Sequence, residues 1–179
     1  MTLRRRGPAR LIPGTWTERD LLASAHADFA AFTNELRARL RPAGAQPVER
    51  GDILVFGKGL GAGTSLDRAA LALASSGIGG IVVATVDRAF RDACLHAGLP
   101  LLLVPNPLAA IGDGDDLTVD FAAGTVEDVT RRRVLVATPL ASAELRLVRV
   151  APSLAWYGIT PGPTDPDVVE TVTVAPNDY

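Results

Sequence analysis

The 179-residue sequence is poor in metal-binding and cross-linking side chains: it has one cysteine, Cys94, and two histidines, His26 and His96. A single cysteine forms no disulfide within the chain, which fits a reducing compartment. The sequence contains no CxxC pair and no cluster of cysteine and histidine, so this chain alone cannot assemble a protein-ligated zinc or iron–sulfur site. Any metal chemistry that it joins must come from another component.

The sequence also lacks an excess of basic residues and a long apolar run. A formal net charge of −2 argues against nucleic acid as the main partner. The longest apolar runs, such as Ile81–Ala84 and Leu99–Val104, have the length of strands and are too short to span a bilayer. No apolar stretch follows the arginines near Met1, so a secretory signal is not expected. We therefore expect a soluble, cytoplasmic protein.

The first third of the sequence predicts helices after an irregular lead. Residues 1–15 suggest no regular element. From Asp20 to Leu40 apolar residues recur near helical spacing, and Pro42 and Gly44 follow. This pattern predicts a helix or a helix pair.

The centre of the sequence alternates between strand and helix patterns around a glycine-rich turn, Gly57–Gly63. Two strand–helix–strand units in succession imply a short parallel sheet with helices on its faces. The predicted elements are strands Asp52–Phe56, Ile81–Ala84 and Leu101–Val104, and helices Leu66–Ser76 and Asp87–His96.

Beyond residue 115 the pattern changes to short alternating strands, which predict antiparallel hairpins, followed by a helix over Leu140–Leu147. The fold class is α/β. We expect one domain over residues 1–160 and a tail over 161–179, rich in proline and glycine where it begins, that orders, if at all, on a partner. The elements of this part are strands Asp116–Phe121, Thr125–Val129 and Val134–Ala137.

The glycine-rich turn brings backbone amides to the start of a helix, where an anion can bind. Its spacing, Gly59, Gly61 and Gly63 followed by Thr64 and Ser65, fits neither a Walker A loop nor a dinucleotide fingerprint. Two interpretations stay open at this point. The glycines and one hydroxyl build a tight turn and a helix cap, or the turn is an anion nest, as in a free-standing binder of small ligands.

Several segments in order resemble the small subunits of isopropylmalate dehydratase, within the aconitase swivel-domain family. The main one runs from Gly51 to Ala70 and contains the glycine-rich turn. The likeness covers roughly residues 10 to 145. The other similar segments are Leu11–Trp16, Gly77-Ile78, Arg88–Phe90, Gly98–Pro100 and Gly114–Gly124.

This resemblance implies the swivelling β/β/α domain of aconitases and a role as small subunit of a hydro-lyase or isomerase. A large partner, in a heterodimer or heterotetramer, would carry a [4Fe–4S] cluster on three cysteines. The small subunit would supply a hydroxyl that removes a proton from a small hydroxy-acid substrate, and arginines that bind the substrate's carboxylates.

Carried over by resemblance, the base position falls on Thr64, with Ser65 adjacent, and Gly61 and Gly63 line the substrate. The family's arginine is replaced by Leu66. Arg68 is a candidate for the missing charge; alternatively it pairs with an aspartate, Asp67 or Asp92.

The segment that would set substrate specificity reads Trp16-Thr17-Glu18, followed by Arg19. Glu18 would repel a carboxylate, so either the register shifts to present Arg19, or the substrate differs there. Cys94 is expected to be a buried structural thiol. Two outcomes follow for the complex: it acts on a non-standard substrate in a specialised biosynthetic pathway, or this chain is a catalytically degenerate structural or regulatory subunit.

Overall fold

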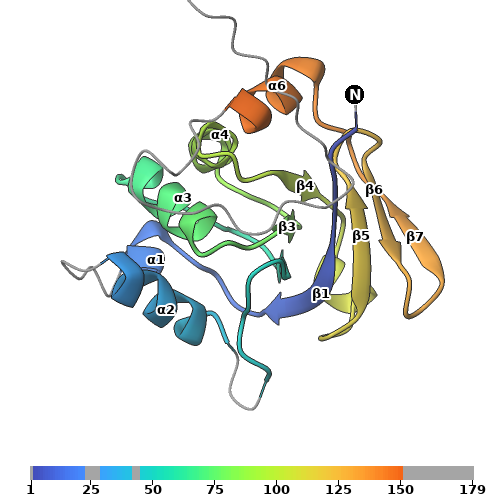
Figure 1. Cartoon of the computed structure of the whole chain (residues 1–179), viewed down its shortest axis with the longest axis horizontal. Coiled ribbons are helices and arrows are strands. Elements are labelled where there is room, and N and C mark those ends of the chain that lie inside the picture. The colour runs from blue at the N-terminus through green and yellow to red at the C-terminus, as the bar shows by residue number, and fades with distance from the viewer. Residues whose placement is uncertain (1, 23–28, 42–44, 151–179) are drawn as a thin grey trace, which may run out of the picture.

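The computed structural model describes residues 2–22, 29–41 and 45–150, whose seven strands form one mixed sheet in the order β4-β3-β2-β1-β5-β6-β7 (Figure 1). The strands are β1 (Arg4–Ile12), β2 (Ile53–Phe56), β3 (Gly80–Val83), β4 (Leu101–Leu103), β5 (Asp116–Asp120), β6 (Thr125–Asp128) and β7 (Arg133–Val136). The helices are α1 (Glu18–Leu22), α2 (Phe29–Arg39), α3 (Leu66–Ser75), α4 (Arg88–His96), α5 (Pro107–Ala110) and α6 (Ser142–Val150).

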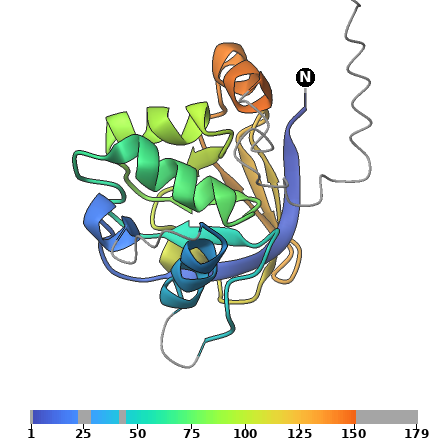
Figure 2. The same cartoon turned by 60° about the vertical axis from the view of Figure 1, so that its left-hand side comes forward.

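The parallel part of the sheet consists of β2, β3, β4 and the second half of β1. Every residue of β2 and β3 is buried, because both faces of these strands are covered. Figures 1 and 2 show α1 to α4 together on one side of these strands and β5, β6 and β7 on the other. The result is three layers, antiparallel strands, parallel strands and helices, which confirms the expected α/β fold of β/β/α type.

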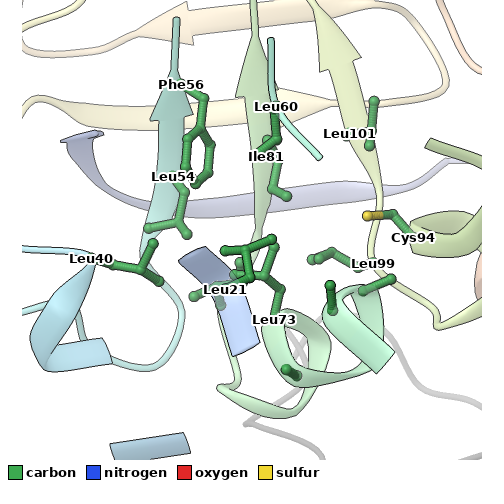
Figure 3. Close-up of a cluster of buried hydrophobic side chains, with 14 of the residues drawn as sticks. Leu21, Leu40, Leu54, Phe56, Leu60, Leu73, Ile81, Cys94, Leu99 and Leu101 are labelled. Carbon is green, nitrogen blue, oxygen red and sulfur yellow. The ribbon is translucent and has the colours of Figure 1, made fainter. Parts of the chain in front are cut away.

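Each face of the parallel strands has its own core. On the helical side, Leu54, Phe56 and Ile81 pack against leucines of α1 and α3 (Figure 3). On the other side, Val55 and Val82 belong to a cluster that includes residues of β5, β6 and α6. The alternation of side chains along a strand divides each of these runs between the two cores.

The expectation of an irregular lead over residues 1–15 was wrong, because β1 spans nine residues in the middle of the sheet. Residues Arg4 to Pro8 pair antiparallel with β5, and Ala9 to Ile12 pair parallel with β2. The strand changes partner between Pro8 and Ala9, just after Gly7, where a Cβ would lie 2.2 Å from the Gly51 carbonyl oxygen.

The arginines of β1, which obscure its strand pattern in the sequence, are paired with aspartates of other elements. The guanidinium of Arg10 lies 2.7 Å from Asp52, and that of Arg6 lies 2.6 Å from Asp116. A run of charged residues, interrupted by glycine and proline, has no strand pattern of its own, and its pairing depends on residues distant in sequence.

The remaining elements match the sequence-based expectations within one to three residues at their ends. The helix or helix pair expected over Asp20–Leu40 corresponds to α1 and α2, and α5 was not predicted. Cys94 is fully buried on α4, as expected, and burial raises the pKa of its thiol. The expected tail over residues 161–179, and the division of the chain at residue 160, lie outside the described residues.

Candidate functional site

The glycine-rich turn leaves the carboxyl end of β2 and enters α3, next to the connection from β3 to α4. The amide of Gly59 donates to the Thr85 hydroxyl at 2.9 Å, and the amide of Asp87 donates to the Leu60 carbonyl at 2.9 Å. These bonds hold the starts of α3 and α4 side by side at the carboxyl ends of the parallel strands. Ligand sites of open parallel sheets lie outside these strand ends.

Gly61 is required by the packing of the turn. Its φ of +88° is unfavourable for other residues, and a Cβ there would lie 2.1 Å from the ring of Phe90 on α4. The glycine therefore lets the turn press against α4. The resemblance predicts that Gly61 lines the substrate. Its positive φ and its contact with Phe90 are a separate, structural reason for glycine at this position.

The amino end of α3 carries both hydroxyls that the resemblance singled out. Ser65 occupies the N-cap position, but its side chain makes no capping hydrogen bond. Ser65 is half-buried and Thr64 is exposed. The expected cap by the Ser65 hydroxyl is therefore absent, and another polar group lies at this helix end.

That group is the carboxylate of Glu18, which lies 46 residues earlier in the sequence. Its Oε2 accepts a hydrogen bond from the Thr64 amide at 2.9 Å. Hydrogen bonds from the Thr64 amide, then from the Ser65 amide, lower the pKa of Glu18, and the Ser65 hydroxyl contributes less. A negative charge at the positive end of a helix is a stabilising arrangement.

The segment that carries Glu18 is fixed on both sides. The amide of Gly61 donates to the Trp16 carbonyl at 2.7 Å, and the amide of Glu18 donates to the Ala62 carbonyl at 2.9 Å. Asp20 accepts hydrogen bonds from the amide and hydroxyl of Thr17, at 2.8 and 2.7 Å, which sets the start of α1. Glu18, the first residue of α1, is therefore directed at α3, as the neighbouring positions of α1 and α3 in Figure 1 suggest.

Gly63 accommodates the Glu18 side chain. A Cβ at Gly63 would lie 2.3 Å from Glu18 Oε2 and 2.4 Å from Glu18 Cβ. The structure thus brings together Gly61, Gly63, Thr64 and Ser65, with Glu18 among them. Sequence reasoning missed this partnership, because no local pattern links residue 18 to residue 64.

The candidate arginines lie outside this cluster of hydrogen bonds. Arg19 and Arg68 are exposed, and the structure gives neither a hydrogen bond nor an ion pair within the ranges it describes. The alternative pairing of Arg68 with Asp67 or Asp92 is therefore absent there. Leu66, at the family's arginine position, packs partly buried against the core of the helical side.

No group of three or more His, Cys, Asp or Glu side chains that would suit a metal ion is found in residues 2–22, 29–41 and 45–150. Within the same ranges, every helix is too short or too polar to cross a membrane. The only cysteine, Cys94, has no exposed surface, so it is not accessible as a cluster ligand.

The comparisons with known proteins agree with this architecture. The chain is 34% identical over 130 residues to the 3-isopropylmalate dehydratase small subunit of Methanosarcina acetivorans, a match that covers 73% of this chain and 75% of the relative. The chain belongs to the family of 3-isopropylmalate dehydratase small subunits. Its members are named as subunits of hydro-lyases, and a small subunit implies a larger partner.

Other relatives extend the picture. The small subunit from Pyrobaculum calidifontis is 33% identical over 107 residues, and the match spans 60% of this chain and 66% of that relative. The 2,3-dimethylmalate dehydratase small subunit of Eubacterium barkeri is 34% identical over 84 residues, 47% of this chain and 52% of the relative. No family model matches the sequence.

Among solved structures, a 3-isopropylmalate dehydratase from Methanocaldococcus jannaschii superposes with a TM-score of 0.72. It covers 87% of this chain and 93% of its own, at 16% sequence identity. At that identity the likeness establishes the fold alone.

Proposed function

We propose that the chain is the small subunit of a heteromeric hydro-lyase or isomerase that depends on a [4Fe–4S] cluster and acts on a non-standard hydroxy acid. The large partner would bind the cluster, because this chain has one cysteine and that cysteine is buried. The chain itself would supply a hydroxyl base and groups that bind the substrate. Its cytoplasmic location stays a prediction.

The observation that carries the proposal is the free hydroxyl pair at the amino end of α3. The Ser65 side chain makes no capping hydrogen bond, and Glu18 is bound at this helix end through the Thr64 amide. Thr64 is exposed, so a substrate held by a partner can approach it. Such a group must reach hydrogen-bond distance of the proton that it removes.

Glu18 favours Thr64 over Ser65 as the base. The Ser65 hydroxyl is one of the groups that lower the pKa of Glu18, so it lies close to that carboxylate. Ionising Ser65 would place a second negative charge next to Glu18. Thr64 contributes only its backbone amide to Glu18, and its hydroxyl is free of this conflict.

The loss of the family's arginine favours an alternative, a structural or regulatory subunit without catalysis. Leu66 packs into the helical side of the protein and offers no charge to a carboxylate. Arg68 and Arg19, both exposed, are the candidates for replacing that charge. The free-standing anion binder is disfavoured, because a carboxylate of the chain already occupies the nest.

The test is co-expression with the candidate large subunit, anaerobic reconstitution of the cluster, and an alkene absorbance assay on a panel of hydroxy acids. The variants are Thr64→Ala, Thr64→Ser, Ser65→Ala and Arg68→Ala, with Thr138→Ala as a control threonine that is exposed and follows β7. We expect Thr64→Ala to lower kcat by about a hundredfold or more, and Thr64→Ser to retain much of it. A complex that forms but turns over no substrate would favour the structural alternative.

A further inference from the structure

The position where an external anion would bind at α3 is filled by a side chain of the same protein. The Thr64 amide, 2.9 Å from Glu18 Oε2, is the donor that a substrate carboxylate would otherwise meet first at this helix. Glu18 does not reach this position by chance rotation of an exposed side chain. Backbone hydrogen bonds from Gly61 to Trp16 and from Glu18 to Ala62 attach its segment to the turn.

The turn is also shaped for this carboxylate. Gly63 leaves the space that the Cβ and Oε2 of Glu18 occupy, and any larger residue would displace them. The start of α1, set by Thr17 and Asp20, fixes the backbone from which Glu18 extends. The glycine-rich turn and the specificity segment therefore fit one another without an external ligand.

We propose that Glu18 is a specificity-determining residue, which excludes substrates that place a carboxylate against the amides of Thr64 and Ser65. It admits hydroxy acids that present an uncharged hydrogen-bond donor there, such as a hydroxyl or a primary amide. This inference rests on the proposed function, in which the amino end of α3 faces the substrate.

The negative charge of Glu18 and the loss of the family's arginine both support this selection. A carboxylate cannot share the position of Glu18, because two negative charges at hydrogen-bond distance repel. The arginine that would offset this repulsion is replaced by Leu66. A neutral donor instead gains a hydrogen bond to an ionised carboxylate, which is stronger than one between neutral groups. The Glu18 carboxylate therefore discriminates between a substrate that presents a carboxylate and one that presents a neutral hydrogen-bond donor.

The first arm of the test uses the isolated full-length chain and needs no turnover. Malonate and its mono-amide are titrated into ¹⁵N-labelled wild type, Glu18→Gln and a control, Glu127→Gln, which alters an exposed carboxylate on β6. We expect malonate to shift the Thr64 and Ser65 amide resonances in Glu18→Gln only. Equal shifts in all three proteins would overturn the proposal.

The second arm uses the reconstituted complex and the ratio of kcat/KM for a monocarboxylate mono-amide to that for the matching dicarboxylate. We expect Glu18→Gln to lower this ratio by about tenfold or more, mainly through KM, with Glu127→Gln unchanged. An unchanged ratio in Glu18→Gln, or a wild type that prefers the dicarboxylate, would overturn the role of Glu18. Absence of turnover in every protein would contradict the proposed function, and the first arm would still decide where Glu18 acts.

Discussion

The amino ends of α3 and α4 lie side by side and are capped in different ways. α4 begins after Asp87, whose own side chain accepts a hydrogen bond from the Phe90 amide at 3.1 Å. α3 begins after Ser65, whose side chain makes no such bond, and the amide of the preceding residue, Thr64, donates to Glu18 from a distant part of the sequence. Both helices follow parallel strands of the same sheet.

The difference shows how a helix end can be stabilised and still keep its own polar side chains available. A local cap such as Asp87 uses the side chain that it places at the helix end. Glu18 instead accepts the amide of the residue before the N-cap and leaves the hydroxyls of Thr64 and Ser65 for other partners. The remotely capped end is the one at which the family resemblance puts the base.

The largest expected effect concerns the contact that joins the two helix ends, between Gly61 and Phe90. Gly61→Ala imposes an unfavourable φ, at a cost of about 1 kcal/mol, and overpacks the contact, at about 1–3 kcal/mol more. Gly14→Ala is the matched control, since Gly14 has a φ of +89° with nothing within 4 Å of its Cβ position. Urea unfolding of both variants measures the difference, and equal losses would mean that the Phe90 contact is not tight.

The local cap of α4 gives the next effect. Asp87→Ala should lower the free energy of unfolding by about 1 kcal/mol, because it removes the acceptor of the Phe90 amide. Hydrogen exchange should accelerate at the first turn of α4 and stay unchanged at α3. A stability equal to that of the wild type would show that solvent replaces this cap at no cost.

The remote cap of α3 should have a smaller effect that depends on pH. The folded protein lowers the pKa of Glu18 from its ordinary 4.5. Its stabilising contribution is therefore complete above pH 4.5 and is lost as the pH falls through the folded pKa. Glu18→Gln should be less stable than the wild type near neutral pH, and the gap should close in acid. A gap that stays constant from neutral pH to acid would show that charge has no part in it.

The smallest effect is expected at Ser65. Because its side chain makes no capping bond, Ser65→Ala should change the free energy of unfolding by less than about 0.5 kcal/mol. Chemical denaturation of this variant beside Asp87→Ala compares the two caps directly. A loss as large as that of Asp87→Ala would mean that Ser65 caps α3 after all.

The same distinction between local and remote contacts explains which parts of the fold follow from the sequence. The helix after Asp87 and the buried strand Gly80–Val83 are marked by their own residues, so periodicity and caps predict them. No local sequence pattern predicts β1, because its arginines pair with distant aspartates. Asp52 lies more than forty residues from its partner in the sequence, and Asp116 more than one hundred.

In the candidate site, too, the residues of one segment were predicted from the sequence, and the contact between distant segments was not. Collinear resemblance located Thr64, Ser65 and the glycines, since these lie within one segment of the sequence. The same reasoning took Glu18 as a group that would face and repel a substrate. The structure gives it a second role as the cap of α3, and that role depends on how the first strand brings residues 16–18 beside the turn.

The most direct test of this account is a pH titration of the Thr64 amide, followed by its ¹⁵N–¹H resonance in the wild type and in Glu18→Gln. The amide donates to Glu18, so its chemical shift should follow the ionisation of that carboxylate. We predict an inflection below pH 4.5 in the wild type and none in Glu18→Gln. A wild-type resonance without an inflection, or the same inflection in both proteins, would contradict the capping of α3 by Glu18.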